Sequence, residues 1–95
     1  MTDKTAHIVR SWTHLYQPMA AGLKTHDLRL NDRDYQVGDR LLMQEYDPAK
    51  GALTGQETLV EITYITGRDE GHNPCAVSSV VLHPDYVILS IKRVD

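Results

Sequence analysis

Two cations and an acid fall within six positions of this sequence: Lys24, Arg29 and Asp27. Lysine and arginine donate hydrogen bonds and a carboxylate accepts them, so the three together could hold a phosphate or read the edge of a nucleobase. Two interpretations are open. In the first, all three side chains converge at a cleft. In the second, Asp27 and Arg29 form an ion pair on a sheet face and Lys24 is solvated.

The backbone between these residues decides which interpretation holds. Residues two apart on a strand share a face, so Asp27 and Arg29 would point the same way, whereas Lys24 would face oppositely. Lys24 can join them only if residues 22–25 form a turn or bulge that re-aims it. Gly22 suits such a turn, because glycine commonly ends a helix. Spacing alone favours the ion pair with a solvated lysine.

The surrounding hydrophobic pattern predicts one short helix and five or six strands. Trp12, Leu15, Tyr16 and Met19 recur at i, i+3, i+4 and i+7, which predicts a helix from near His14 with these four side chains in the core. Ser11 or Thr13 is expected to cap it, and Pro18 lies past its first turn. Strands are predicted at 7–10, 26–30, 40–46, 57–65, 76–82 and 86–94, and a mobile loop at 67–74.

Alternation within the strands predicts which residues share a face. The expected sets are Leu41 with Met43, Val60 with Ile62 and Tyr64, and Val87 with Leu89 and Ile91. Pattern and composition therefore indicate a small α+β or β-barrel domain spanning 1–95, with 1–5 frayed.

Composition narrows the classes of function. The formal net charge is −3 and the pI about 5.9, which argues against coating nucleic acid by charge alone. Nucleic-acid contact would then be local, at a pocket or a single-stranded segment. One cysteine, Cys75, and no run of eighteen apolar residues favour a cytoplasmic protein without a membrane partner.

Metal and cofactor sites are not expected. His72 and Cys75 are the one closely spaced pair of soft ligands, whereas a zinc site needs three or four ligands. The glycines fit no phosphate-binding loop, so no cofactor is predicted. The oligomeric state is left open.

Gly22, Lys24, Asp27 and Arg29 together resemble the signature of the ASCH domains, a branch of the PUA-like β-barrels, in which the acid is usually glutamate. Residues 31–39, 45–48, 54–55 and 86–94 resemble the DUF3850 proteins more closely still. The likeness runs from about His7 to Val94. It implies a PUA-like mixed β-barrel of five or six strands with one or two short helices.

The same resemblance implies a function. ASCH relatives are regarded as RNA-binding modules, so the expected partner is RNA or a modified nucleotide. The ligand-binding residues would be Lys24, Thr25, Asp27, Arg29, Arg33 and Tyr46.

One ASCH branch hydrolyses N4-acetylcytidine, which makes a small amidohydrolase the alternative, with Lys24 and Asp27 as its catalytic residues. That branch has threonine where this chain has Asp27 and a glutamate on a later insertion, where this chain offers Glu70. Both departures favour binding over catalysis.

Overall fold

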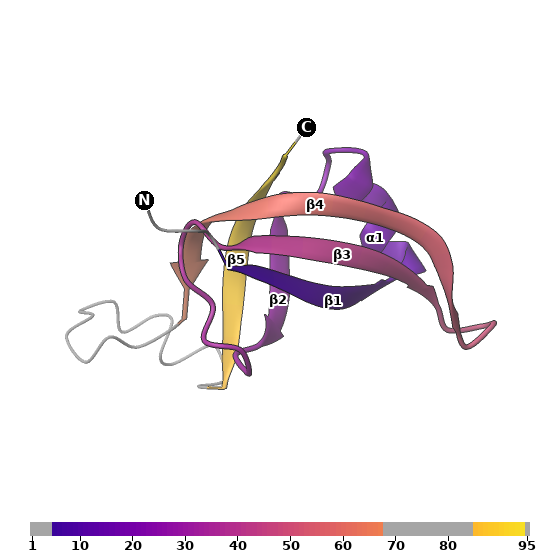
Figure 1. Cartoon of the computed structure of the whole chain (residues 1–95), viewed down its shortest axis with the longest axis horizontal. Coiled ribbons are helices and arrows are strands. Elements are labelled where there is room, and N and C mark those ends of the chain that lie inside the picture. The colour runs from indigo at the N-terminus through magenta and orange to yellow at the C-terminus, as the bar shows by residue number, and fades with distance from the viewer. Residues whose placement is uncertain (1–4, 68–84, 95) are drawn as a thin grey trace.

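The computed structural model describes residues 5–67 and 85–94, where one helix packs on a five-stranded sheet (Figure 1). In chain order the elements are β1 (Ala6–Trp12), α1 (Thr13–Ala20), β2 (His26–Leu30), β3 (Arg40–Asp47), β4 (Ala52–Thr66) and β5 (Tyr86–Arg93). Five of the predicted strands are thus confirmed, with β4 starting earlier than expected. The strand predicted at 76–82, and the predicted loop from residue 68 on, lie outside the described residues.

The sheet is mixed, in the order β1-β3-β4-β5-β2. β1 runs parallel to β3, and every other neighbouring pair is antiparallel. The final strand lies between β4 and β2, as its apolar sequence predicts. The sheet curls so that β1 and β2 form its two edges, which makes the described fold a half-barrel and corrects the expectation of a closed barrel.

The core fills the concave side of this half-barrel. Leu41 and Met43 of β3 are fully buried, and Val87, Leu89 and Ile91 of β5 are at most 5% exposed. The predicted alternation of β3 and β5 is therefore confirmed. Tyr16 and Met19 of α1 and Tyr35 from the β2–β3 connection complete the cluster.

Strand β4 departs from its predicted alternation. Val60 and Ile62 are buried as expected, but Tyr64 is exposed. The pairing of β4 with β5 shifts register between Ile62 and Tyr64, and such a bulge reverses the face of the residues beyond it. Ile65 packs against the core in the place predicted for Tyr64.

The prediction that Trp12 is a core residue is also wrong. Trp12 is the last residue of β1 and precedes α1, so the alternation of the strand sets its direction. Val9 and Ser11 point inward, and Trp12 points outward with 52% of its surface exposed. Leu15 is exposed as well. The prediction that Ser11 or Thr13 caps α1 is wrong as well. The N-cap is Trp12, which makes no side-chain capping hydrogen bond. Thr13 Oγ1 instead donates to the Tyr46 carbonyl at 3.3 Å.

The end of α1 explains how the chain turns toward β2. Gly22 has φ of +82°, a left-handed conformation that glycine adopts without strain. Its N–H donates to Met19 O at 3.0 Å and the Leu23 N–H donates to Pro18 O at 2.9 Å. This pair of bonds is the Schellman motif of a glycine-ended helix. The sequence therefore predicts the turn at Gly22 correctly, and the turn re-aims Lys24.

Candidate functional site

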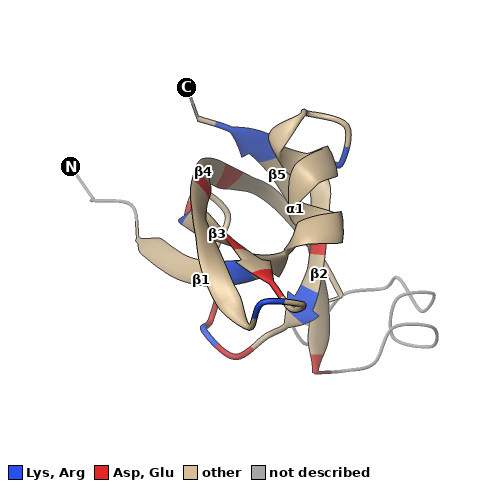
Figure 2. Ribbon diagram, turned by 90° about the vertical axis from the view of Figure 1, so that its right-hand side faces the viewer, with Lys and Arg blue, Asp and Glu red and all other residues tan. Residues whose placement is uncertain are grey.

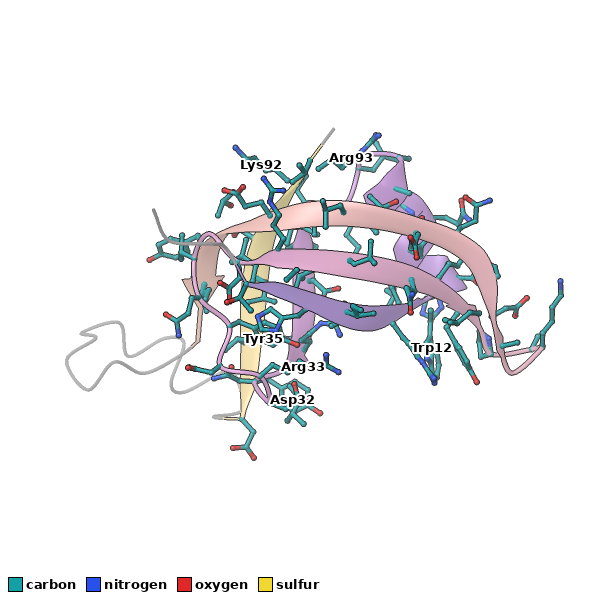
Figure 3. All side chains as sticks on the ribbon, in the orientation of Figure 1. Trp12, Asp32, Arg33, Tyr35, Lys92 and Arg93 are labelled. Atoms are coloured by element: carbon teal, nitrogen blue, oxygen red, sulfur yellow. The ribbon has the colours of Figure 1, made fainter. Side chains whose placement is uncertain are left out.

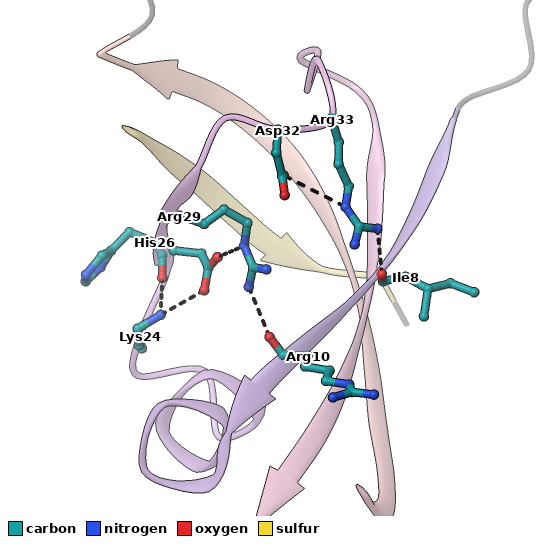
Figure 4. Close-up of polar contacts among 8 residues, drawn as sticks. Ile8, Arg10, Lys24, His26, Arg29, Asp32 and Arg33 are labelled. Carbon is teal, nitrogen blue, oxygen red and sulfur yellow. Dashed lines mark hydrogen bonds and ion pairs between the residues drawn. The ribbon is translucent and has the colours of Figure 1, made fainter. Parts of the chain in front are cut away.

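Lys24 and Arg29 both contact Asp27 at the start of β2, and Figure 4 shows these two cations with the groups they bind. Arg29 Nε donates to Asp27 Oδ2 at 2.5 Å, and Lys24 Nζ lies 3.5 Å from Asp27 Oδ1. Lys24 Nζ also donates to the His26 carbonyl at 2.5 Å. Asp27 is 4% exposed, so a nearly buried carboxylate separates the two cations. The expected Asp27–Arg29 ion pair exists, but the expectation of a solvated Lys24 is wrong, because Lys24 joins the pair and is 16% exposed.

Two arginines cross the gap between β1 and β2, the two edge strands of the half-barrel. Arg29 lies in β2, and Arg33 follows that strand. Arg29 Nη2 donates to the Arg10 carbonyl at 3.4 Å, and Arg33 Nη1 donates to the Ile8 carbonyl at 2.8 Å. These carbonyls belong to the outer edge of β1, which has no neighbouring strand in the described sheet (Figure 4). The guanidinium groups occupy backbone acceptors that another strand would otherwise pair with.

A groove of about 290 Å³ lies where α1 begins, between β1 and β2. We call it the Trp12 groove. Its walls combine the apolar side chains of Trp12, Leu15 and Leu28 with the charged side chains of Arg10, Asp27 and Arg29. Trp12 and Leu28 are each more than half exposed, so apolar surface is open to solvent beside two cations.

The structure divides the predicted ligand-binding residues among different places. Asp27 and Arg29 line the Trp12 groove. Lys24 and Thr25 line a separate cavity, which neither Asp27 nor Arg29 lines. Arg33 lies farther along the gap between β1 and β2, where its Nε is 3.9 Å from Asp32 Oδ1. Tyr46 lies under Arg10, whose guanidinium carbon is 5.2 Å from the ring centroid.

The groove residues missed from the sequence are Arg10, Ser11, Trp12, Leu15 and Leu28. A strand signal could have found two of them. If residues 6–12 are one strand, then Ile8, Arg10 and Trp12 share its outer face, opposite the buried Val9 and Ser11. The helical spacing of Trp12 with Leu15, Tyr16 and Met19 concealed this alternation.

Tyr35 is a core residue that packs beside Arg29. It is 1% exposed, and its ring makes an edge-to-face contact with His7 at 4.9 Å between centroids. Burial raises the pKa of the Tyr35 hydroxyl above its usual value of 10, an effect that the positive charge of Arg29 opposes. The phenol therefore stays neutral at physiological pH and acts as a packing and hydrogen-bonding group beside Arg29.

A second buried carboxylate, Glu45, fastens α1 to the sheet. Its oxygens accept hydrogen bonds from Gln17 Nε2 of α1 and Thr54 Oγ1 of β4, each at 2.8 Å. These hydrogen bonds lower the pKa of Glu45 below its usual value of 4.5, and the bond from Gln17 has the largest effect. A carboxyl group whose pKa is lowered by folding stabilises the fold at pH values above 4.5. This stabilisation is lost as the pH falls through the lowered pKa.

Replacing Glu45 with glutamine should therefore flatten the acid limb of the stability profile. We expect the free energy of unfolding of the wild type to fall from about pH 5 toward about pH 3, and that of Glu45→Gln to fall less steeply over the same range. Urea unfolding at several pH values measures both. Glu57→Gln is the matched control, because Glu57 is exposed. Identical slopes in wild type and Glu45→Gln would contradict the assignment.

Comparison with protein families matches the profile described as "Domain of unknown function (DUF3850)" to residues 6–91. The chain belongs to the DUF3850 family. The match covers all five strands up to Ile91, together with α1 and the Lys24–Asp27–Arg29 cluster. No curated protein matches the sequence.

Two further findings concern this DUF3850 domain. Within residues 5–67 and 85–94, no three His, Cys, Asp or Glu side chains gather as they would around a metal ion. His72, Cys75 and Glu70 lie outside those residues. In the same described part of the chain, no helix has the length and apolar character needed to span a membrane.

Proposed function

We propose that this protein binds single-stranded RNA or a modified nucleotide in the Trp12 groove, as an ASCH-type domain of the PUA-like group. The observation that carries the proposal is the exposed Trp12 beside Arg10 and Arg29 in one groove of about 290 Å³. That volume is near the lower end of the range for small-ligand pockets, roughly 300–1,000 Å³. One nucleotide is a ligand of suitable size.

The groove offers what a nucleobase requires. Aromatic side chains stack on bases of any sequence, and arginine planes add stacking and donors to phosphate. Arg10 is held against Tyr46, and Arg29 is fixed by Asp27, so both guanidinium groups are oriented before a ligand arrives. Preorganisation of this kind lowers the entropy lost on binding.

Charge sets the mode of binding. Asp27 offsets part of the positive charge of Lys24 and Arg29, and the whole chain carries a net charge of −3. Few phosphates would therefore be neutralised, and affinity should fall only shallowly with added salt. This favours an unpaired base and its flanking phosphates over a duplex.

Binding can be followed through Trp12, the one tryptophan in the sequence. We expect single-stranded RNA to quench its fluorescence at low salt. For labelled RNA followed by anisotropy, Trp12→Ala should cost about 1–3 kcal/mol, about a 5- to 150-fold loss of affinity, because it removes one stacking platform. Arg10→Ala should also weaken binding.

Leu53→Ala is the matched control, since Leu53 is exposed but does not line the groove. Equal affinities of Trp12→Ala and the wild type would reject the groove as the site. If the protein bound neither RNA nor free nucleosides at low salt, the proposed RNA-binding function would be wrong.

The amidohydrolase alternative gains less support from the geometry. Lys24 Nζ donates to the His26 carbonyl and to the Asp27 carboxylate, and both contacts favour its charged, protonated form. A nucleophile or general base needs a free lone pair. Incubation with N4-acetylcytidine tests it directly: we expect no cytidine, and release of cytidine that depends on Lys24 would favour the enzyme.

A further inference from the structure

Strand β2 has a neighbour on one side only, because β5 is the single strand that pairs with it in the described sheet. Just before β2, the Ile91 N–H donates to Thr25 O at 3.0 Å, and just after it the Asn31 N–H donates to Asp85 O at 2.8 Å. Residues that exchange hydrogen bonds with an antiparallel neighbour alternate along a strand. Alternation from Thr25 to Asn31 therefore turns the backbone N–H and C=O of Leu28 away from β5, to the free edge that faces β1.

The backbone carbonyls around Leu28 on the two facing edges are already hydrogen-bonded within the chain. Side chains or a turn supply the donors to the carbonyls of Ile8, Arg10, His26 and Leu30, and Figure 4 shows the first three. Within residues 5–67 and 85–94, no such bond involves the N–H or C=O of Leu28. An added peptide strand would need acceptors at every second residue of β2, so this edge is closed to a strand but open at Leu28.

Leu28 lines the Trp12 groove, which lies between β1 and β2. Figure 2 shows an acidic and a basic segment of β2 below α1. These segments are Asp27 and Arg29, and Leu28 lies between them. Figure 3 shows Trp12 at the end of β1 and well separated from Arg33, whose guanidinium group crosses another part of the gap. At the groove, the open N–H and C=O of Leu28 therefore point toward the strand that ends with the exposed Trp12.

The open groups of Leu28 require a partner that offers a hydrogen-bond donor and an acceptor side by side. Every standard nucleobase offers such a pair on its Watson–Crick edge, an edge that proteins contact on unpaired bases. We propose that a base stacked on Trp12 pairs through this edge with the N–H and C=O of Leu28. The inference rests on the proposed RNA function and adds the class of ligand: an unpaired base without a methyl group on its Watson–Crick edge.

Oligouridine is the probe, compared with the same oligomer built from N3-methyluridine. The methyl group at N3 removes the donor for the Leu28 carbonyl and leaves the phosphates unchanged. We expect anisotropy titrations to show at least about fivefold weaker binding, because the carbonyl is covered by the ligand without receiving a hydrogen bond. An oligomer of C5-methyluridine is the control, because its added methyl group lies away from this edge. It should bind about as tightly as oligouridine.

The substitution Leu28→Pro tests the backbone N–H directly. Proline is tolerated on an edge strand where its position faces away from the neighbouring strand, so no bond between β2 and β5 is lost. Leu28→Ala is the matched control, because it shortens the same side chain and keeps the N–H. We expect Leu28→Pro to bind oligouridine at least about fivefold more weakly than Leu28→Ala.

Equal affinity of the wild type for the N3-methyl and C5-methyl oligomers would overturn the inference, and so would equal affinity of the two folded variants for oligouridine. If Leu28→Pro does not fold, the two methylated oligomers decide alone. The RNA proposal would survive either result as long as oligouridine binds and Trp12→Ala weakens it. If no oligomer bound at low salt, both proposals would be wrong.

Discussion

Asp27→Asn is expected to lower the free energy of unfolding by about 3 kcal/mol. The substitution keeps the shape of the side chain but removes the carboxylate that Arg29 Nε and Lys24 Nζ share. Removing one partner of a buried ion pair costs about 3–5 kcal/mol, since the remaining charge is left without compensation. The lower end applies here, because the Lys24 and Arg29 side chains retain 16% and 19% of their exposure.

Urea unfolding near pH 7 measures this loss. The matched control is Asp32→Asn, which removes an ion pair of 3.9 Å between half-exposed side chains. Exposed pairs contribute about 0–1 kcal/mol. If Asp27→Asn cost no more than the control, the Lys24–Asp27–Arg29 cluster would not support the fold. In that case Lys24 and Arg29 would be held in place by their carbonyl contacts alone.

Ile91→Ala should be the next most damaging change, with an expected loss of about 2–5 kcal/mol. Ile91 is 5% exposed on β5, which has a neighbouring strand on each side, and lies opposite Ile62, which is fully buried. Truncation removes apolar contacts and leaves a cavity that flanking strands cannot easily close. The midpoint and slope of urea unfolding give the magnitude.

Ile88→Ala provides the comparison within the same strand. Ile88 is only partly buried, because it faces away from Ile91 and lies opposite the exposed Leu28 of β2. Its truncation should cost clearly less. A loss below about 0.5 kcal/mol for Ile91→Ala would place that side chain outside the core and contradict the register of β5.

Local sequence determined the elements and much of the core. The period-two alternation of residues 40–46 and 86–94 predicted which side chains of β3 and β5 are buried, because each strand has one face on the core. Gly22 predicted the end of α1, since the left-handed conformation required there favours glycine. Spacing alone favoured a solvated Lys24, and the conformation of the turn after Gly22 is what brings Lys24 to Asp27.

Tertiary structure decided the rest of the candidate site. Trp12 satisfies a helical pattern and a strand pattern at once, and its direction was fixed only when β1 paired with β3. The bulge beyond Ile62 turned Tyr64 outward because it depends on pairing with β5. Arg10 meets Arg29 across the gap between strands that are distant in sequence. Such contacts depend on strand order and sheet curvature, which residue spacing does not encode.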